Sequence, residues 1–176
     1  MRSTLLQCFF TWRVKTANEA ELAKADVILV QSFGLRSDSS GKSNHMLAAI
    51  VYRLHHELHI PIIAQHEVAD YLPEPPLYVI QKHRVAGEYL DTFEVMAQSY
   101  DVCVQHAFTN PIIVAHPDHQ WRVMKVSERF GLHPLAADVT LVPYDWLSIQ
   151  WWTRRKAFFI FRELLARLKY WKEGKI

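Results

Sequence analysis

Three short runs of apolar residues stand out along the chain, and each is continuous rather than alternating with polar positions. They read DVILVQS at residues 26–32, IPIIAQ at residues 60–65 and NPIIVAH at residues 110–116. A strand that is apolar on both sides of its backbone is typical of a parallel sheet covered by helices on both faces. The three runs therefore predict three central strands.

Helical patterns separate these runs. Apolar residues recur at spacings of three and four within residues 43–59, 87–107 and 119–130. The third of these segments ends at Gly131, and glycine is a common residue at a helix C-terminus. A fourth strand is expected within residues 133–142, after this third helix.

A last helix is expected at roughly residues 154–171. Its apolar positions form one stripe, made by Phe158, Phe161, Leu164, Leu165, Leu168 and Trp171. Strands alternating with helices predict an α/β fold, a three-layer Rossmann-like sandwich with a mostly parallel central sheet, in one domain over residues 1–176. Residues 71–87, with three prolines, interrupt the alternation and predict either a lid or an added edge strand.

Open parallel sheets bind ligands beyond the carboxyl ends of their strands, where the winding of the chain changes direction. This rule selects three loops, at residues 32–44, from residue 65 onward and at residues 116–122. The first loop contains Gly-Lys-Ser at Gly41, which suggests a phosphate-binding P-loop. Such a loop needs a glycine five positions earlier, where this chain has Arg36, and Gly34 lies two positions too early. The spacing therefore does not predict a P-loop.

The end of the third strand carries candidate chemistry in the sequence VAHPDHQWR. His119 and Arg122 lie one turn apart near a helix N-terminus, where unpaired N–H groups favour a phosphate or carboxylate. The alternative is a capping turn in which His119 bonds the backbone and Arg122 is solvated. His116 could pair with His119 on a metal, but no cysteine or third histidine follows at a usual spacing, so no metal site is predicted.

Composition excludes several classes of protein. Lys+Arg 20 against Asp+Glu 18 gives a net charge of +2, which offers no argument for a nucleic-acid partner. Cys8 and Cys103 are too few for a disulfide framework, and Cys103 lies on a predicted core stripe. The pair His55 and His59 lacks the HExxH pattern, which would need histidine at Ile60, so it predicts a solvated helix face. With no signal core and no apolar run of transmembrane length, we expect a soluble, cytoplasmic protein without an integral membrane segment.

The order of these parts resembles the YdcF/SanA-like family, a set of Rossmann-like proteins labelled as a domain of unknown function. In that family a third strand ends in VTSxxHxxRA, and VAHPDHQWRV is similar to it at Val114, His119 and Arg122. The family's Asn-Thr-x-Glu-like motif is matched by DTFE at Thr92 and Glu94. The resemblance rests on the order and spacing of motifs that are individually weak.

The resemblance covers roughly residues 25–174, including the closing helix FRELLARLKYWKEG with Glu163 in the family's usual acidic position. Two departures stand out. AQHE at residues 64–67 replaces a Ser-Gly-Gly-like turn, and Ala115-His116 replaces Thr-Ser. Side chains thus occupy places where backbone would approach a ligand, so the bound molecule is expected to differ from that of better-known members, or the site to have decayed.

The resemblance implies a small-molecule pocket formed by the loops after the first three strands. The implied ligand or cofactor contains adenosine, either S-adenosylmethionine or another nucleotide. His119 and Arg122 would form its anionic or catalytic end. The expected ligand-binding residues are Gln31, Ser32, Gly34, Asn44, Gln65, His66, Glu67, Thr92 and His116. Alternatives from the residues alone are a solvated connector for the first loop, a helix cap for Thr92 and an exposed loop carboxylate for Glu67.

Three function classes follow. The first is a nucleotide- or S-adenosylmethionine-binding protein, with or without catalysis. The second is a hydrolase or transferase acting on a phosphate-containing substrate, with His119 as general acid or base and Arg122 stabilising charge. The third is a non-catalytic interaction protein that uses residues 144–156, YDWLSIQWWTRRK, for which the family resemblance implies association with the cell envelope and peripheral membrane contact. The alternative for this segment is that Trp146, Trp151 and Trp152 pack the last helix onto the sheet.

Overall fold

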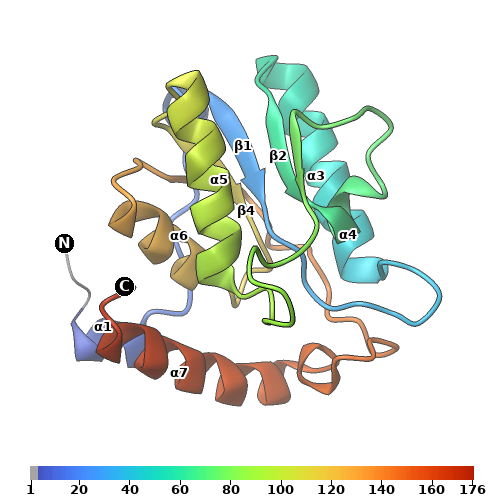
Figure 1. The fold of residues 1–176 in the computed structure, drawn as a ribbon, viewed down its shortest axis with the longest axis vertical. Helices are drawn as coiled ribbons and strands as arrows, with labels where there is room; N and C mark the ends of the chain where they lie inside the picture. The colour runs from blue at the N-terminus through green and yellow to red at the C-terminus, as the bar shows by residue number, and fades with distance from the viewer. Residues whose placement is uncertain (1–3) are drawn as a thin grey trace.

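The computed structural model describes residues 4–176, which form a five-stranded parallel sheet with helices on both faces (Figure 1). The strand order is β3-β2-β1-β4-β5. The strands are β1 (Val27–Val30), β2 (Ile62–Gln65), β3 (Tyr78–Ile80), β4 (Pro111–Val114) and β5 (Leu135–Ala136). The predicted fold class is confirmed, and the winding reverses between β1 and β4, which are neighbours in the middle of the sheet.

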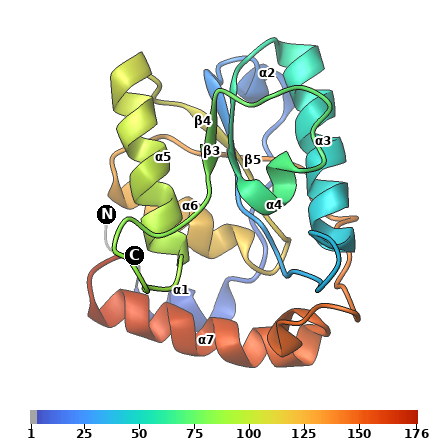
Figure 2. The same cartoon turned by 45° about the vertical axis from the view of Figure 1, so that its right-hand side comes forward.

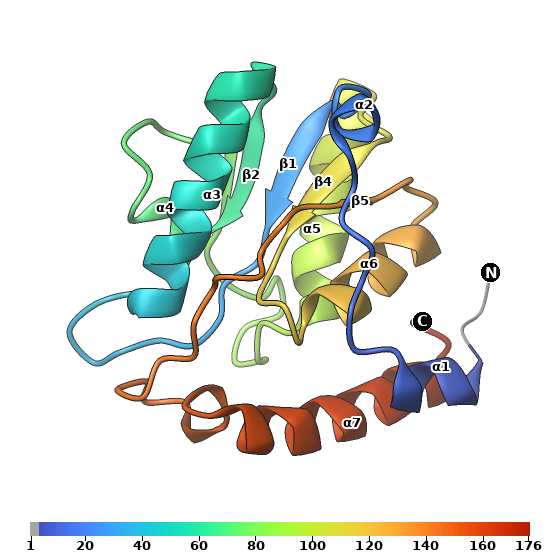
Figure 3. The same ribbon diagram turned by 180° about the vertical axis from the view of Figure 1, so that it is seen from behind.

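Eight helical segments surround the sheet within residues 4–176. They are α1 (Leu5–Phe10), α2 (Glu19–Leu22), α3 (Lys42–Leu58), α4 (His66–Ala69), α5 (Thr92–His106), α6 (Gln120–Arg129), the 3-10 turn η1 (Trp151–Thr153) and α7 (Lys156–Lys172). Figures 1 and 3 show α3 on one face of the sheet and α5 and α6 on the other. The helices α1, α2 and α4 are short and have no counterpart among the sequence-based expectations.

The continuous apolar runs reflect a sheet that is buried on both faces. Along β1, Val27 and Leu29 belong to the core under α5 and α6, whereas Ile28 and Val30 belong to the core under α3. Alternate side chains of a strand point to opposite faces, so a strand between two helical layers needs apolar residues at every position. Cys103 is buried in the α5 side of this core, as predicted.

The helix boundaries follow from local capping. The α5 helix begins at Thr92 rather than near residue 87, because Asp91 caps it by accepting a hydrogen bond from the Glu94 backbone N–H at 2.9 Å. After α6, Gly131 adopts φ +83°, the left-handed conformation that ends many helices, as expected. Residues 71–87 supply the edge strand β3, which bears out the edge-strand alternative for this segment.

The closing helix α7 runs across the carboxyl ends of the strands, with α1 beside it (Figures 1 and 2). Its predicted apolar stripe is divided, because Phe158, Phe161 and Leu165 are exposed whereas Leu164, Leu168 and Trp171 are partly buried. The face turned inward carries Phe159, Glu163, Arg167 and Tyr170. The exposed half of the stripe therefore marks the outer side of the helix.

Of the three tryptophans before α7 that could have packed this helix onto the sheet, only Trp152 does so. The side chains of Trp146 and Trp151 are exposed, at 57% and 51%. None of the helices in residues 4–176 is long and apolar enough to cross a membrane.

Candidate functional site

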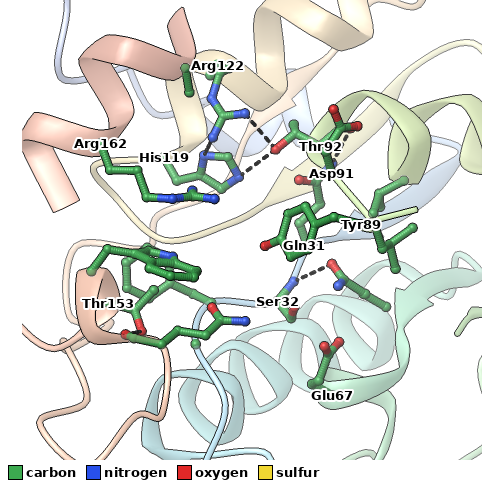
Figure 4. A pocket seen from close by; sticks show the side chains of 18 of the residues that line it. Gln31, Ser32, Glu67, Tyr89, Asp91, Thr92, His119, Arg122, Thr153 and Arg162 are labelled. Atoms are coloured by element: carbon green, nitrogen blue, oxygen red, sulfur yellow. Dashed lines mark hydrogen bonds between the residues drawn. The ribbon is translucent and has the colours of Figure 1, made fainter. Parts of the chain in front are cut away.

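A cavity of about 410 Å³ lies at the carboxyl ends of the strands, between the sheet and α7 (Figure 4). This volume falls in the range of small-molecule pockets, roughly 300–1,000 Å³. Its walls come from the ends of β1 and β2, from the start of α5, from α6 and from α7. The cavity therefore sits where the topology rule places ligands.

Most of the predicted site residues meet in this cavity, although they come from distant parts of the chain. Those in its lining are Gln31, Ser32, Gly34, Gln65, His66, Glu67, Thr92, His119 and Arg122. Their convergence follows from the parallel sheet, because the loops after β1, β2 and β4 all leave from the same edge. Two predicted residues, Asn44 and His116, lie outside the lining.

Asn44 shapes the first loop instead of facing the cavity. Its side-chain oxygen accepts a hydrogen bond from the Phe33 backbone N–H at 2.7 Å, and its amide donates to the carbonyl oxygens of Gly34 and Ser40. His116 lies behind Phe33, with the two rings stacked 3.7 Å apart. Both residues thus hold the loop after β1 in place from behind.

The N-terminus of α3 shows what replaces a P-loop. The Asp145 carboxylate accepts hydrogen bonds from the Lys42 backbone N–H at 2.8 Å and from the Arg36 guanidinium at 2.8 Å. Burial tends to raise the pKa of this carboxyl, but Arg36 and the backbone N–H groups hold it below its ordinary value. An internal carboxylate therefore occupies the position where a P-loop holds phosphate.

A buried ion cluster forms the α6 side of the cavity. Arg122 donates two bonds from Nε to Glu163 at 3.0 and 3.1 Å and one from Nη2 at 2.8 Å. Its Nη1 donates to Thr92 Oγ1 at 2.9 Å, and the His119 ring lies 3.3 Å from that hydroxyl. The alternative of a solvated Arg122 is wrong, because the side chain is buried and paired.

The cluster fixes the protonation of its members. Burial would raise the pKa of Glu163, but the charge of Arg122 and contacts to His119 hold it below the ordinary value, so the side chain is a carboxylate. Burial, followed by the positive charge of Arg122, lowers the pKa of His119. His119 is therefore a neutral imidazole at physiological pH.

Arg167 extends the cluster away from the cavity toward α1. Its Nε donates to Glu163 at 3.0 Å, and its Nη1 donates to the carbonyl oxygens of Cys8 and Thr11 at 3.2 and 2.7 Å. The guanidinium also contacts the rings of Trp12 and Trp121. Glu163 thus joins the cavity to α1 through two arginines.

A second, acidic wall faces this cluster. Glu67 lies in the first turn of α4, two residues after β2, and is only 8% exposed; its Oε2 atom has no hydrogen-bond partner in the described chain. Figure 4 shows it across the cavity from His119 and Arg122. The His66 ring nitrogen lies 3.4 Å from the same carboxylate oxygen. Glu67 is therefore a buried carboxylate at the cavity, not an exposed loop residue.

Several lining residues were not among the predicted site residues. From α7 come Arg162, Ala166, Lys169 and Tyr170, from the preceding segment Gln150, Trp152 and Thr153, and from residues 81–91 Gln81, Glu88, Tyr89, Leu90 and Asp91. The Arg162 guanidinium lies over the ring of Trp152 at 4.3 Å. The family-like acidic position of Glu163 was the one available hint that α7 approaches the site.

Comparison of the chain with models of protein families, with curated proteins and with solved structures gives no match. Within residues 4–176, no three histidine, cysteine or acidic side chains gather in an arrangement that could hold a metal ion.

Proposed function

We propose that this protein binds a nucleotide or an S-adenosylmethionine-like molecule in the cavity under α7, as its resemblance to the YdcF/SanA-like family implies. The observation that carries the proposal is the buried Glu67 carboxylate at the end of β2, which has an oxygen without a hydrogen bond in residues 4–176. In Rossmann-like folds an acidic side chain near the switch point accepts hydrogen bonds from ribose hydroxyls. A ribose would satisfy this Glu67 oxygen.

The opposite wall supplies positive charge. Arg162 and Lys169 reach the cavity from α7, and within residues 4–176 Arg162 contacts a tryptophan ring but forms no ion pair. The Nε, Nη1 and Nη2 atoms of Arg122 are all engaged with Glu163, Thr92 and His119, so its task is to hold these side chains rather than to bind the anion itself. We therefore assign the anionic end of the ligand, a phosphate or carboxylate, to Arg162 and Lys169.

Thermal unfolding with added compounds tests this proposal. The panel contains S-adenosylmethionine, S-adenosylhomocysteine, adenine and guanine nucleotides, sugar nucleotides and inorganic phosphate. A ligand at about a hundred times its dissociation constant should stabilise the native state by roughly 2.7 kcal/mol. Glu67→Gln should remove the shift for ribose-containing ligands, because the amide keeps the shape but loses the charged acceptor.

Glu74→Gln is the matched control, because Glu74 is exposed and lies outside the cavity lining. The ligand-induced shift should survive in this variant. If no compound in the panel raises the midpoint, or if both variants lose the shift equally, the proposal fails.

Hydrolysis or transfer of a phosphate is the second candidate, favoured by the neutral His119 ring at the cavity wall. A neutral imidazole can accept a proton from an attacking hydroxyl or water. Release of phosphate from the panel nucleotides should then be lost in His119→Gln while binding persists. Binding without any turnover in the unmodified protein would favour the first candidate.

A further inference from the structure

Three adjacent segments expose apolar side chains at the end of the molecule formed by α7. We call this the basal surface, and it consists of the exposed side chains of α1, residues 146–151 and α7. Its members are Leu5, Leu6, Phe9, Phe10, Trp146, Leu147, Ile149, Trp151, Phe158, Phe161 and Leu165. Figures 1 and 3 show α1 beside α7, and both α1 and the turn η1 contact α7, so α7 links the other two segments.

The exposure of these side chains is large for a soluble surface. Phe10 is 77% exposed, Phe161 64% and Leu147 63%. Single exposed apolar residues are ordinary, but a contiguous set marks a surface that contacts another body. On α7 the set falls at positions 158, 161 and 165, which lie on one helix face.

The charges around the basal surface are mainly positive. Residues 141–172 contain two acidic residues, Asp145 and Glu163, and both are buried in internal ion pairs. The exposed charges of that segment are Arg155, Lys156, Lys169 and Lys172. Residues 4–17 hold Arg13 and Lys15 and no acidic residue at all. The exposed carboxylate of Glu173, at the end of α7, pairs with Lys169 and Lys175.

We infer that the basal surface docks onto an anionic lipid bilayer. Exposed phenylalanine and leucine can enter the acyl boundary, tryptophan suits the headgroup region, and surrounding cations attract anionic headgroups. Arg155 lies over the exposed Trp146 ring at 4.1 Å, which places a cation beside an interfacial aromatic. A second copy of the chain is disfavoured, because two such surfaces would bring like charges together.

Docking has a geometric consequence for the cavity. The outer side of α7 carries Phe161 and Leu165, whereas its inner side lends Arg162 and Lys169 to the cavity wall. A docked protein would hold the cavity one helix above the membrane. The inference stands independently of which ligand the cavity takes.

Vesicle sedimentation tests the inference with the full chain. Vesicles of phosphatidylcholine alone are compared with vesicles that also contain phosphatidylglycerol, at low and high salt. The protein should sediment with the anionic vesicles, bind the neutral ones far more weakly, and be released by salt, since screening shortens the reach of the cations. Absence of binding to the anionic vesicles, or equal binding to both, would overturn the inference.

Two pairs of variants locate the contact. Phe161→Ser with Leu165→Ser should weaken partitioning by roughly tenfold or more, whereas Val104→Ser, at an exposed position of α5, should not change it. Lys156→Glu with Lys172→Glu should have an effect on the order of tenfold or more. The same charge change at Lys24 and Lys42, both exposed outside the basal surface, is the control.

Equal losses in test and control variants would overturn the assignment to the basal surface. Light scattering adds a further decisive outcome. A dimer that forms with rising concentration and dissolves in Phe161→Ser with Leu165→Ser would show that a second copy, not a bilayer, covers this surface.

Discussion

The helices α3 and α7 both have 17 residues, yet they are built in opposite ways. The inward face of α3 is mainly apolar, with Leu47, Val51 and Leu54 among its buried residues. The inward face of α7 carries Glu163 and Arg167, while two of its phenylalanines and a leucine point outward. One helix completes a core and the other closes a cavity, and their amphipathic patterns alone do not say which is which.

The difference lies in what holds each helix to the sheet. Burial of apolar area attaches α3, and this term is broad and tolerant of small changes. The buried side chains of Phe159 and Tyr170 also help to attach α7, but its distinctive contact is a desolvated cluster in which one carboxylate, Glu163, serves two guanidinium groups. Loss of that carboxylate is costly because it leaves buried charges unpaired. The attachment of α7 should therefore be more sensitive to single changes of charge.

The largest expected effect is that of Glu163→Gln. The amide would leave the guanidinium groups of Arg122 and Arg167 without their shared counter-charge in a buried site, and such losses are about 3–5 kcal/mol. Glu57→Gln on α3 is the matched change, since Glu57 forms an exposed pair with Arg53. It should change the free energy of unfolding by less than about 0.5 kcal/mol. Denaturant unfolding of both variants measures the contrast, and similar values for the two would contradict it.

Truncation of a leucine should have the opposite outcome, with a larger loss of stability on α3 than on α7. Leu47→Ala removes a fully buried side chain from the inner face of α3 and should lower the free energy of unfolding by about 2–5 kcal/mol. Leu165→Ala on the outer face of α7 should change it by less than about 0.5 kcal/mol. A large decrease in the free energy of unfolding from Leu165→Ala would contradict the exposed position of this side chain.

Much of this arrangement follows from the sequence, and its limits are instructive. The runs at β1, β2 and β4 predict buried parallel strands because every position in them is apolar except Gln65, the last residue of β2. Parallel strands then bring the loops at Ser32, Glu67 and His119 to one edge, so the cavity follows from the topology. These inferences hold because a continuous apolar run has to be buried on both faces wherever the strand lies in the sheet.

The role of α7 could not be predicted in the same way. An apolar stripe normally faces the core, but here three of its six residues face outward because the inner face must meet Arg122 at the cavity wall. That demand comes from α6, which is distant in sequence. Likewise, Asn44 suggests a ligand contact by its position, but its side chain is fully used by the backbone of the first loop.

Lowering the pH should reveal a further difference, because buried titratable groups lie beside α7 and not on the inner face of α3. The buried residues of α3 include no titratable group, whereas His116 and His119 are buried at the α7 end. Burial lowers the pKa of His116 to about 3, so between pH 6.5 and 3 the unfolded chain binds a proton that the folded chain does not. The stability of the fold must then rise with pH across this window and fall as the pH drops.

At pH 5 the loss from His116 should be about 2 kcal/mol relative to neutral pH. Because the pKa of His119 is also lowered, its contribution has the same sign. Denaturant unfolding at pH 7, 6 and 5 gives the slope, and His116→Leu should make it shallower. An identical slope in the variant would contradict the assignment.

The smallest expected effect concerns the contact between the loop that precedes α3 and the segment that precedes α7. Gly34, in the loop between β1 and α3, has φ +77°, and a Cβ atom there would lie 2.7 Å from Thr153 Oγ1, just before α7. Gly131 has φ +83° and open space where a Cβ atom would lie, so Gly131→Ala isolates the backbone strain of roughly 1–2 kcal/mol. Gly34→Ala should destabilise the fold by more than Gly131→Ala, because its Cβ atom also displaces Thr153, a residue of the cavity wall. Ligand-induced shifts in the unfolding midpoint should therefore weaken in Gly34→Ala and persist in Gly131→Ala. If the two variants behave alike, the first loop and α7 meet without constraining each other, and the cavity is set by the ion cluster alone.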